Sequence, residues 1–158
     1  MELVNLLRSK FCRDDAVVAC VGNELREDDS LGLRLCRALR NHLRNVVECP
    51  GGLELCVGEI IERNPRVLII IDAALFEGDD EIVFAPLDSV IENLIVISTH
   101  GIPLAKVVEF IRRSTHLEEV WILGLRAYSV GFSLELSPRG REVLRKSIEL
   151  LRNVLAQC

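Results

Sequence analysis

Three short runs of nearly uninterrupted apolar residues limit the fold of this 158-residue chain more than any other feature. They span residues 16–21, 67–71 and 120–125, and are built mainly from Val, Ile, Leu and Ala. Strands that are buried on both faces of a sheet have this pattern, because neither face meets water. Such strands are typical of parallel sheets covered by helices on both sides, so the runs predict an α/β fold.

The segments between these runs have the spacing of amphipathic helices. Leucines recur every four residues from Leu31 to Leu43, and arginines occupy the other side of that segment. Further helices are expected at residues 3–10, 53–63, 103–113 and 137–156, and further strands at 46–49, 81–85 and 94–97. This order predicts a three-layer αβα sandwich with a mostly parallel, doubly wound sheet of about five strands, one antiparallel strand being allowed. At this length, residues 1–158 are expected to form a single domain.

Composition and charge argue against several classes of function. The net charge of −5 disfavours nucleic acid and anionic membranes as partners. No apolar run reaches the length of a membrane span, and residues 1–5 lack a signal-peptide pattern. The chain has six cysteines, none in a C-x-x-C pair, and several lie in apolar runs, where a thiol behaves as a small hydrophobe. The sequence therefore predicts a cytoplasmic protein with reduced, mostly structural cysteines.

Acidic residues follow the first apolar run, at the place where a nucleotide-binding α/β protein has glycines. The run ends at Gly22, and the carboxylates that follow are Glu24, Glu27, Asp28 and Asp29. Ligands of open α/β sheets bind outside the carboxyl ends of the strands. Carboxylates at that edge repel phosphate and attract a cation, and the chain has no G-x-G-x-x-G or P-loop motif. The loop therefore favours a cation site.

Two further residues extend this candidate site. Asp72 directly follows the run 67–71, and His100 lies in the loop before the helix expected at 103–113. If the strands are parallel, Asp29, Asp72 and His100 face the same end of the sheet. Two carboxylates and an imidazole suit a divalent transition metal that keeps open positions for other ligands.

Each of these residues also has a purely structural interpretation. Asp28 or Asp29 is equally suited to cap the following helix, where free N–H groups favour a carboxylate. Asp72 is suited to cap a turn, and His100 to be a hydrogen-bonded loop histidine. A catalytic serine near His100 is less well supported, because no G-x-S-x-G motif is present.

Several short motifs occur in a fixed order along the chain. The first is Gly22-Asn23-x-Leu25-x-x-Asp28-Asp29-x-x-Gly32. The later ones are Ile71-Asp72-Ala73, Ser98-Thr99-His100-Gly101, Ile122-Leu123-Gly124 and Leu136-Ser137-Pro138. Together they resemble the hydrogenase maturation endopeptidases over nearly the whole chain. Ser30 departs from the pattern, since that family often has glycine there, but serine is benign at the start of a helix.

The resemblance implies an endopeptidase that removes a short C-terminal extension from the large-subunit precursor of a nickel–iron hydrogenase. Cleavage follows nickel insertion in that family, and nickel is the recognition element. The resemblance assigns metal contact and catalysis to Asp29, Asp72 and His100. Residues expected to bind substrate are Gly22, Asn23, Asp28, Thr99 and Gly101. Residues 127–132 are expected to form a wall of the substrate cleft.

Several consequences and alternatives accompany this resemblance. The nickel is expected to arrive on the precursor, the enzyme is expected to be monomeric, and no nucleotide cofactor is expected. The metal either activates water or the scissile carbonyl, or only positions the tail while another group acts. One alternative is a non-proteolytic metal-binding or assembly chaperone of the same fold. Another is a peptidase for the precursor of a related coenzyme-reducing hydrogenase.

Overall fold

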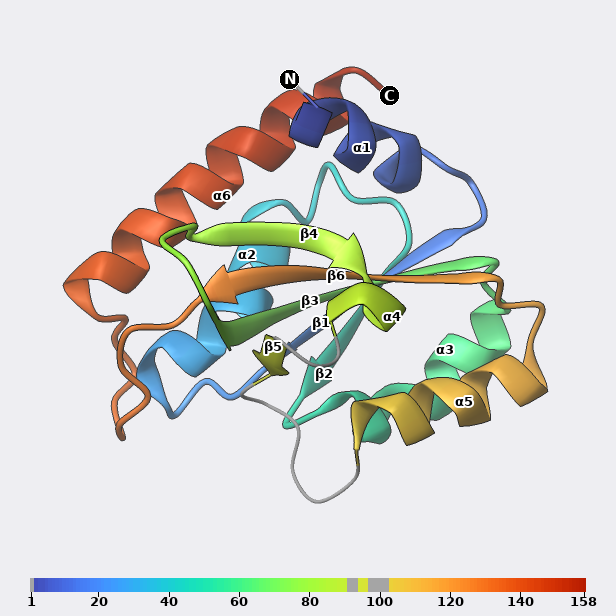
Figure 1. Ribbon diagram of the computed structural model, residues 1–158, viewed down its shortest axis with the longest axis horizontal. Coiled ribbons are helices and arrows are strands. Elements are labelled where there is room, and N and C mark those ends of the chain that lie inside the picture. Colours follow the sequence, from blue (N-terminus) through green and yellow to red (C-terminus); the bar gives the residue numbers. More distant parts are fainter. Residues whose placement is uncertain (1, 91–93, 97–102) are drawn as a thin grey trace.

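A six-stranded sheet forms the centre of the protein, of which the computed structural model describes residues 2–90, 94–96 and 103–158 (Figure 1). The strands are β1 (Ala16–Gly22), β2 (Val46–Pro50), β3 (Val67–Phe76), β4 (Ile82–Pro86), β5 (Leu94–Val96) and β6 (Glu119–Arg126). Their order is β2-β1-β3-β6-β4, and β5 pairs with the end of β3. The three apolar runs form β1, β3 and β6, which are neighbours at the centre of the sheet.

Most of the sheet is parallel, as predicted. β1 pairs in parallel with β2 and β3, and β3 pairs in parallel with β6. Two strands are antiparallel instead of at most one, since β4 pairs with β6 and β5 with β3 in that direction. Residues 77–81 alone connect β3 to β4. That loop is too short for the crossover of roughly a dozen residues that a parallel strand needs, so the chain reverses direction.

Helices cover both faces of the sheet, which confirms the predicted three layers. α1 (Glu2–Phe11), α2 (Leu31–Ala38) and α6 (Pro138–Ala156) lie on one face, and α3 (Val57–Arg63) and α5 (Leu104–Ser114) on the other (Figure 1). The short helices are η1 (Glu27–Ser30), η2 (Leu53–Cys56) and α4 (Leu87–Val90). The apolar core accordingly has two parts, one on each face of the sheet. Within the described residues, no helix combines the length and apolar character needed to cross a bilayer.

Two helix ends show how far the sequence signals extend. Ser137 caps α6 as predicted, because its hydroxyl accepts a hydrogen bond from Gly140 N (2.9 Å) and Pro138 begins the helix. The leucine pattern overestimates α2, which ends at Ala38 although Leu39 and Leu43 are still buried. Residues in the following turns also bury their side chains, so the apolar spacing continues beyond the end of the helix.

The prediction of reduced cysteines is wrong. The structure contains the disulfides Cys12–Cys158, Cys20–Cys36 and Cys49–Cys56, and no cysteine is left free. The first joins the two ends of the chain, the second joins β1 to α2, and the third closes the loop after β2. None of these pairs has a diagnostic spacing, because the fold and not the local sequence brings the partners together. The cysteines are structural, as predicted, but they act as cross-links.

Candidate active site

The loop after β1 carries the acidic residues to the carboxyl edge of the parallel strands. It leads into η1, which contains Asp28 and Asp29 and packs against β1 and β3. Asp29 N donates to Arg26 O, and Asp29 O accepts from Asn23 N, both at 3.0 Å. Asp29 is fully buried. The structure therefore places Asp29 at the edge where the sequence expects it.

Asn23 shapes the first turn of this loop. Its side-chain Oδ1 accepts a hydrogen bond from Leu25 N at 2.9 Å, and its backbone O accepts one from Arg26 N at 3.3 Å. Asparagine suits this position because its side chain can replace a backbone acceptor in a turn. Binding of substrate by Asn23 stays a prediction.

Two glycines allow η1 and α2 to approach the sheet closely. A Cβ atom on Gly22 would lie 2.6 Å from Asp29 O. A Cβ atom on Gly32 would lie 2.3 Å from Val21 O and 2.6 Å from Ile71 O. Any side chain at either position would push η1 or α2 away from β1 and β3. Gly22 thus has a structural role beside Asp29, and its contact with substrate stays a prediction.

Asp72 lies within β3 on the neighbouring strand. It pairs with Gly124 of β6 and is 1% exposed. Its expected place at the end of the strand is wrong, because β3 continues to Phe76 and its last residues pair with β5. Cys20 of β1 pairs with Ile71, so Asp72 is level with the last residues of β1.

The loop of Asp29 and the strand of Asp72 flank the point where the strand order reverses. β1 leads to β2 on one side, whereas β3 lies on the other side of β1 and leads toward β6. Doubly wound folds bind ligands in the crevice at this switch point. The two carboxylates therefore lie at the position where this architecture places a ligand.

Asp28 faces the interior and fastens η1 to the β6–α6 loop (residues 127–137). Its carboxylate is fully buried and accepts hydrogen bonds from Tyr128 N (2.8 Å), Ser129 N (3.2 Å) and Ser137 N (2.9 Å). It also accepts one from the Ser137 hydroxyl (2.7 Å), the group that caps α6. This arrangement gives Asp28 a positioning role for its neighbour Asp29. The expected substrate contact of Asp28 remains untested.

The other two acids of the loop also have partners within the protein. Glu27 has a positive φ of 47° and accepts hydrogen bonds from Ser129 Oγ and Gly131 N, both at 2.8 Å. Glu24 forms an ion pair with Arg37 at 2.9 Å, and the hydrogen bond in that pair lowers the pKa of Glu24. The partners of Glu27 could not be predicted from the sequence, because Ser129 and Gly131 lie about a hundred residues further on.

A second electrostatic contact holds the β6–α6 loop on its other side. The Glu81 carboxylate accepts hydrogen bonds from Lys146 Nζ (2.7 Å) and from the Tyr128 hydroxyl (2.8 Å). The lysine first, and then the tyrosine, lower the pKa of Glu81. Burial, followed by the hydrogen bond to Glu81, raises the pKa of Tyr128. The β6–α6 loop is therefore tied to Glu81, directly before β4, as well as to η1, and Glu81 is in turn bonded to α6.

Three predicted site residues, Thr99, His100 and Gly101, lie outside the described residues. The described residues before them are those of β5, whose last residue Val96 pairs with Ala74, two positions beyond Asp72. Those after them begin with Pro103, which occupies the N-cap position of α5 without a side-chain capping hydrogen bond. The roles of Thr99, His100 and Gly101 stay predictions.

Metal ligands other than carboxylates are scarce in the described part of the chain. No group of three or more His, Cys, Asp and Glu side chains is arranged there to hold a metal ion. All six cysteines are in disulfides, so the protein offers no thiolate of its own. As ligands, Asp29 and Asp72 would offer oxygen atoms only.

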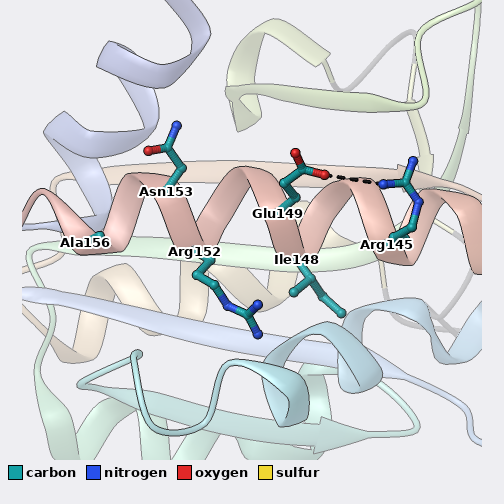
Figure 2. A pocket seen from close by; sticks show the side chains of 6 residues that line it. All are labelled: Arg145, Ile148, Glu149, Arg152, Asn153 and Ala156. Carbon is teal, nitrogen blue, oxygen red and sulfur yellow. Dashed lines mark hydrogen bonds and ion pairs between the residues drawn. The ribbon is translucent and has the colours of Figure 1, made fainter.

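A surface hollow along α6 is a poor candidate for the active site. It has a volume of about 530 Å³ and is lined by Arg145, Ile148, Glu149, Arg152, Asn153 and Ala156 (Figure 2). All six come from one helix, and Arg145 forms an ion pair with Glu149 at 3.3 Å. The lining contains no nucleophile or histidine, whereas the edge with Asp29 and Asp72 combines residues of two elements.

Comparison with known proteins identifies the family. The sequence model of the hydrogenase maturation protease family matches residues 50–154, about two thirds of the chain. The chain belongs to the hydrogenase maturation protease family. A putative hydrogenase maturation protease of Methanocaldococcus jannaschii is 25% identical over 169 residues, covering 98% of each protein.

Solved structures share the fold of this chain. The [NiFe] hydrogenase maturation protease HycI of Thermococcus kodakarensis has a TM-score of 0.75 and 26% identity, with 99% of each chain covered. The hydrogenase maturating endopeptidase HybD of E. coli has a TM-score of 0.70 and 20% identity, with 90% of this chain and 92% of that chain covered. As a member of this family the protein is an endopeptidase with the family's α/β fold. The matched range contains Asp72 and His100, whereas Asp29 precedes it.

Proposed function

We propose that this hydrogenase maturation protease removes the C-terminal extension of a nickel–iron hydrogenase large-subunit precursor after nickel has been inserted. The observation that carries the proposal is the pair of buried carboxylates, Asp29 and Asp72, on either side of the sheet's switch point. The family assignment and the printed names of the similar proteins support the choice of substrate.

The donor chemistry supports a metal that the precursor carries. Asp29 and Asp72 supply oxygen ligands, and His100 would add an imidazole, which together suit a divalent transition metal with open positions. The disulfides leave the enzyme without a free thiolate. Soft sulfur ligands for nickel would therefore come from the precursor. The coordination sphere of the metal would be complete only when both proteins contact it.

The enzyme's own residues would bind and orient in this mechanism. Asp29, Asp72 and His100 would hold the precursor's nickel, which when bound would polarise the scissile carbonyl or a water molecule, or would only position the tail. Asp28 and Glu27 would keep the loop of Asp29 in place against the β6–α6 loop through their hydrogen bonds. A precursor without metal would lack the contact between its nickel and Asp29, Asp72 and His100.

The test is a cleavage assay on nickel-loaded and nickel-free precursor, read by mass spectrometry. We expect a shorter product from the nickel-loaded precursor only, and none with Asp72→Ala or His100→Ala. Asp14→Ala and His42→Ala are matched controls, because both side chains are exposed at the opposite edge of the sheet. Persistent cleavage by both site variants would contradict the assigned roles.

The same assay separates the alternative functions. Tight nickel or precursor binding without a shorter product would favour the chaperone. Cleavage of only a coenzyme-reducing hydrogenase precursor, in a panel run side by side, would reassign the substrate. A monomer is expected because the substrate is a much larger protein, and sedimentation of the enzyme would test this expectation.

A further inference from the structure

Exposed large apolar side chains gather at the edge of the sheet that carries the candidate site. Among the described residues these side chains are Leu25, Leu55, Leu75, Phe110, Phe132 and Leu134. All except Phe110 lie in or next to loops beyond the carboxyl ends of β1, β2, β3 and β6. Phe110 belongs to α5. Contiguous exposed apolar surface on a soluble protein marks a site of interaction, whereas scattered single residues do not.

Three of these residues, which we call the apolar rim, come from two loops that are bonded to each other. They are Leu25 (54% exposed), Phe132 (89%) and Leu134 (66%). Arg26 and Ser133 form a parallel bridge, so Leu25 and Phe132 occupy the neighbouring positions just before it. Ser133 N donates to Leu25 O at 3.0 Å, and Ser133 O accepts from Glu27 N at 3.1 Å.

The apolar rim is held in an exposed position by its surroundings. Gly131 N and Ser129 Oγ donate to the Glu27 carboxylate on one side of Phe132. The Arg34 guanidinium donates to Leu134 O on the other. These bonds fix the backbone of both loops, so the exposure of Phe132 belongs to the folded loop.

Several charged side chains beside the apolar rim have partners within the protein. Glu24 forms an ion pair with Arg37, and Glu27 is bonded to the β6–α6 loop. Arg34 is hydrogen-bonded to Ser30 Oγ at 2.7 Å. A hollow of about 510 Å³ adjoins the rim and is lined by Leu134 and Leu144 together with the charged residues Glu24, Arg34 and Arg37. The rim therefore suits an apolar partner segment better than an acidic or basic one.

We propose that the apolar rim docks apolar residues of the hydrogenase large-subunit precursor beside its cleavage site. The inference rests on the proposed function for the identity of the partner. The place of docking follows from the position of the rim. The loop of Leu25 continues directly into η1 with Asp29, and the β6–α6 loop is bonded to Asp28. A precursor bound at the loop of Asp29 would therefore lie next to the rim.

The test compares Phe132→Ala and the double variant Phe132→Ala/Leu134→Ala with Phe110→Ala, an exposed apolar residue on α5. Binding of nickel-loaded precursor is measured by biolayer interferometry, and processing is measured as separate KM and kcat values. We expect the rim variants to raise Kd and KM by about ten- to a hundredfold, the cost of losing a well-buried aromatic anchor, with kcat unchanged. Phe110→Ala should match the wild type, and Phe132→Leu should restore most of the affinity.

Each outcome has a distinct meaning. If the wild type cleaves the precursor and the rim variants keep its Kd and KM, the docking proposal is wrong while the proposed function stands. If the precursor binds through the rim but is not cut, docking stands and the endopeptidase assignment fails. A wild-type dimer that Phe132→Ala converts to a monomer would overturn the proposal and assign the rim to a second copy of this chain.

Discussion

The strongest stability prediction concerns Asp28, whose carboxylate is fully buried and accepts four hydrogen bonds. In Asp28→Asn one oxygen becomes an NH₂ group of nearly the same size, so the change is in hydrogen bonding and charge. Oδ1 accepts from Ser137 N, whereas Oδ2 accepts from Tyr128 N, Ser129 N and the Ser137 hydroxyl. Whichever oxygen is replaced, the new NH₂ group faces at least one backbone N–H donor.

The magnitude follows from this mismatch. A hydrogen bond to a charged acceptor contributes roughly 1.5–3 kcal/mol, and a buried donor left without an acceptor costs about 1–3 kcal/mol. The loss is smaller when the NH₂ group replaces Oδ1. The bond from Ser137 N is then broken, and two donors, Ser137 N and the new NH₂ group, face each other in the interior. We therefore expect a destabilisation of about 3 kcal/mol. In a domain of this size that corresponds to a Tm lower by about 6–12 °C.

The assay is urea unfolding followed by circular dichroism, together with a thermal scan. Asp14→Asn is the matched control, because it makes the same chemical change on a side chain that is 91% exposed and paired with Arg44 at the surface. Its expected effect is at most about 1 kcal/mol. If Asp28→Asn unfolds within about 0.5 kcal/mol of the wild type, the buried carboxylate does not hold the two loops together, and our account of the loop that carries Asp29 is refuted.

Three further predictions concern other parts of the fold. Gly32→Ala should destabilise the protein by at least roughly 1–3 kcal/mol because its Cβ would overlap the backbone of β1 and β3, whereas Gly58→Ala on α3, which has open space around it, should be neutral or slightly stabilising in the same urea titration. Cys158→Ser should lower the free energy of unfolding by about 2–5 kcal/mol, since the bond to Cys12 spans 146 residues, and leave processing unchanged; lost processing in a folded variant would contradict this. The pKa of Glu81 is lowered in the folded state, so its ion pair stabilises the protein above the unfolded pKa and is lost as the pH falls through the folded value. Glu81→Gln should therefore flatten the fall in Tm between about pH 5 and pH 3, and an unchanged slope would show that the pair contributes nothing.

The layers and strands could be predicted from the sequence because their signals are local. Apolar runs at 16–21, 67–71 and 120–125 form the three central strands, since burial on both faces leaves no room for polar alternation. Ser137 could be identified as a cap from its position before Pro138 alone. The edge position of Asp29 follows from the same local order of strand, loop and helix.

The contacts that hold the site together could not be predicted, because they join residues far apart in sequence. Asp28 has the same local signature as a helix cap, yet its partners Tyr128 and Ser137 lie about a hundred residues away. The disulfide between Cys20 and Cys36 likewise depends on how α2 packs on β1. Asp72 could be placed near a strand end, but the extension of β3 depends on β5, which pairs with it only in the fold.

The hydrogen-bond and ion-pair partners of the acidic loop distinguish between two ways in which the loop could bind a metal. A loop that stores free cations would turn several carboxylates toward one ion, as hard-cation sites do. Here Glu24 is paired with Arg37, and Glu27 and Asp28 accept hydrogen bonds from the β6–α6 loop. These three charges therefore shape and fasten the loop, while Asp29 lies in η1, which packs against β3, the strand of Asp72. Asp29 and Asp72 alone would hold a metal well only if another molecule supplied further ligands, which agrees with the proposal that the precursor delivers the metal.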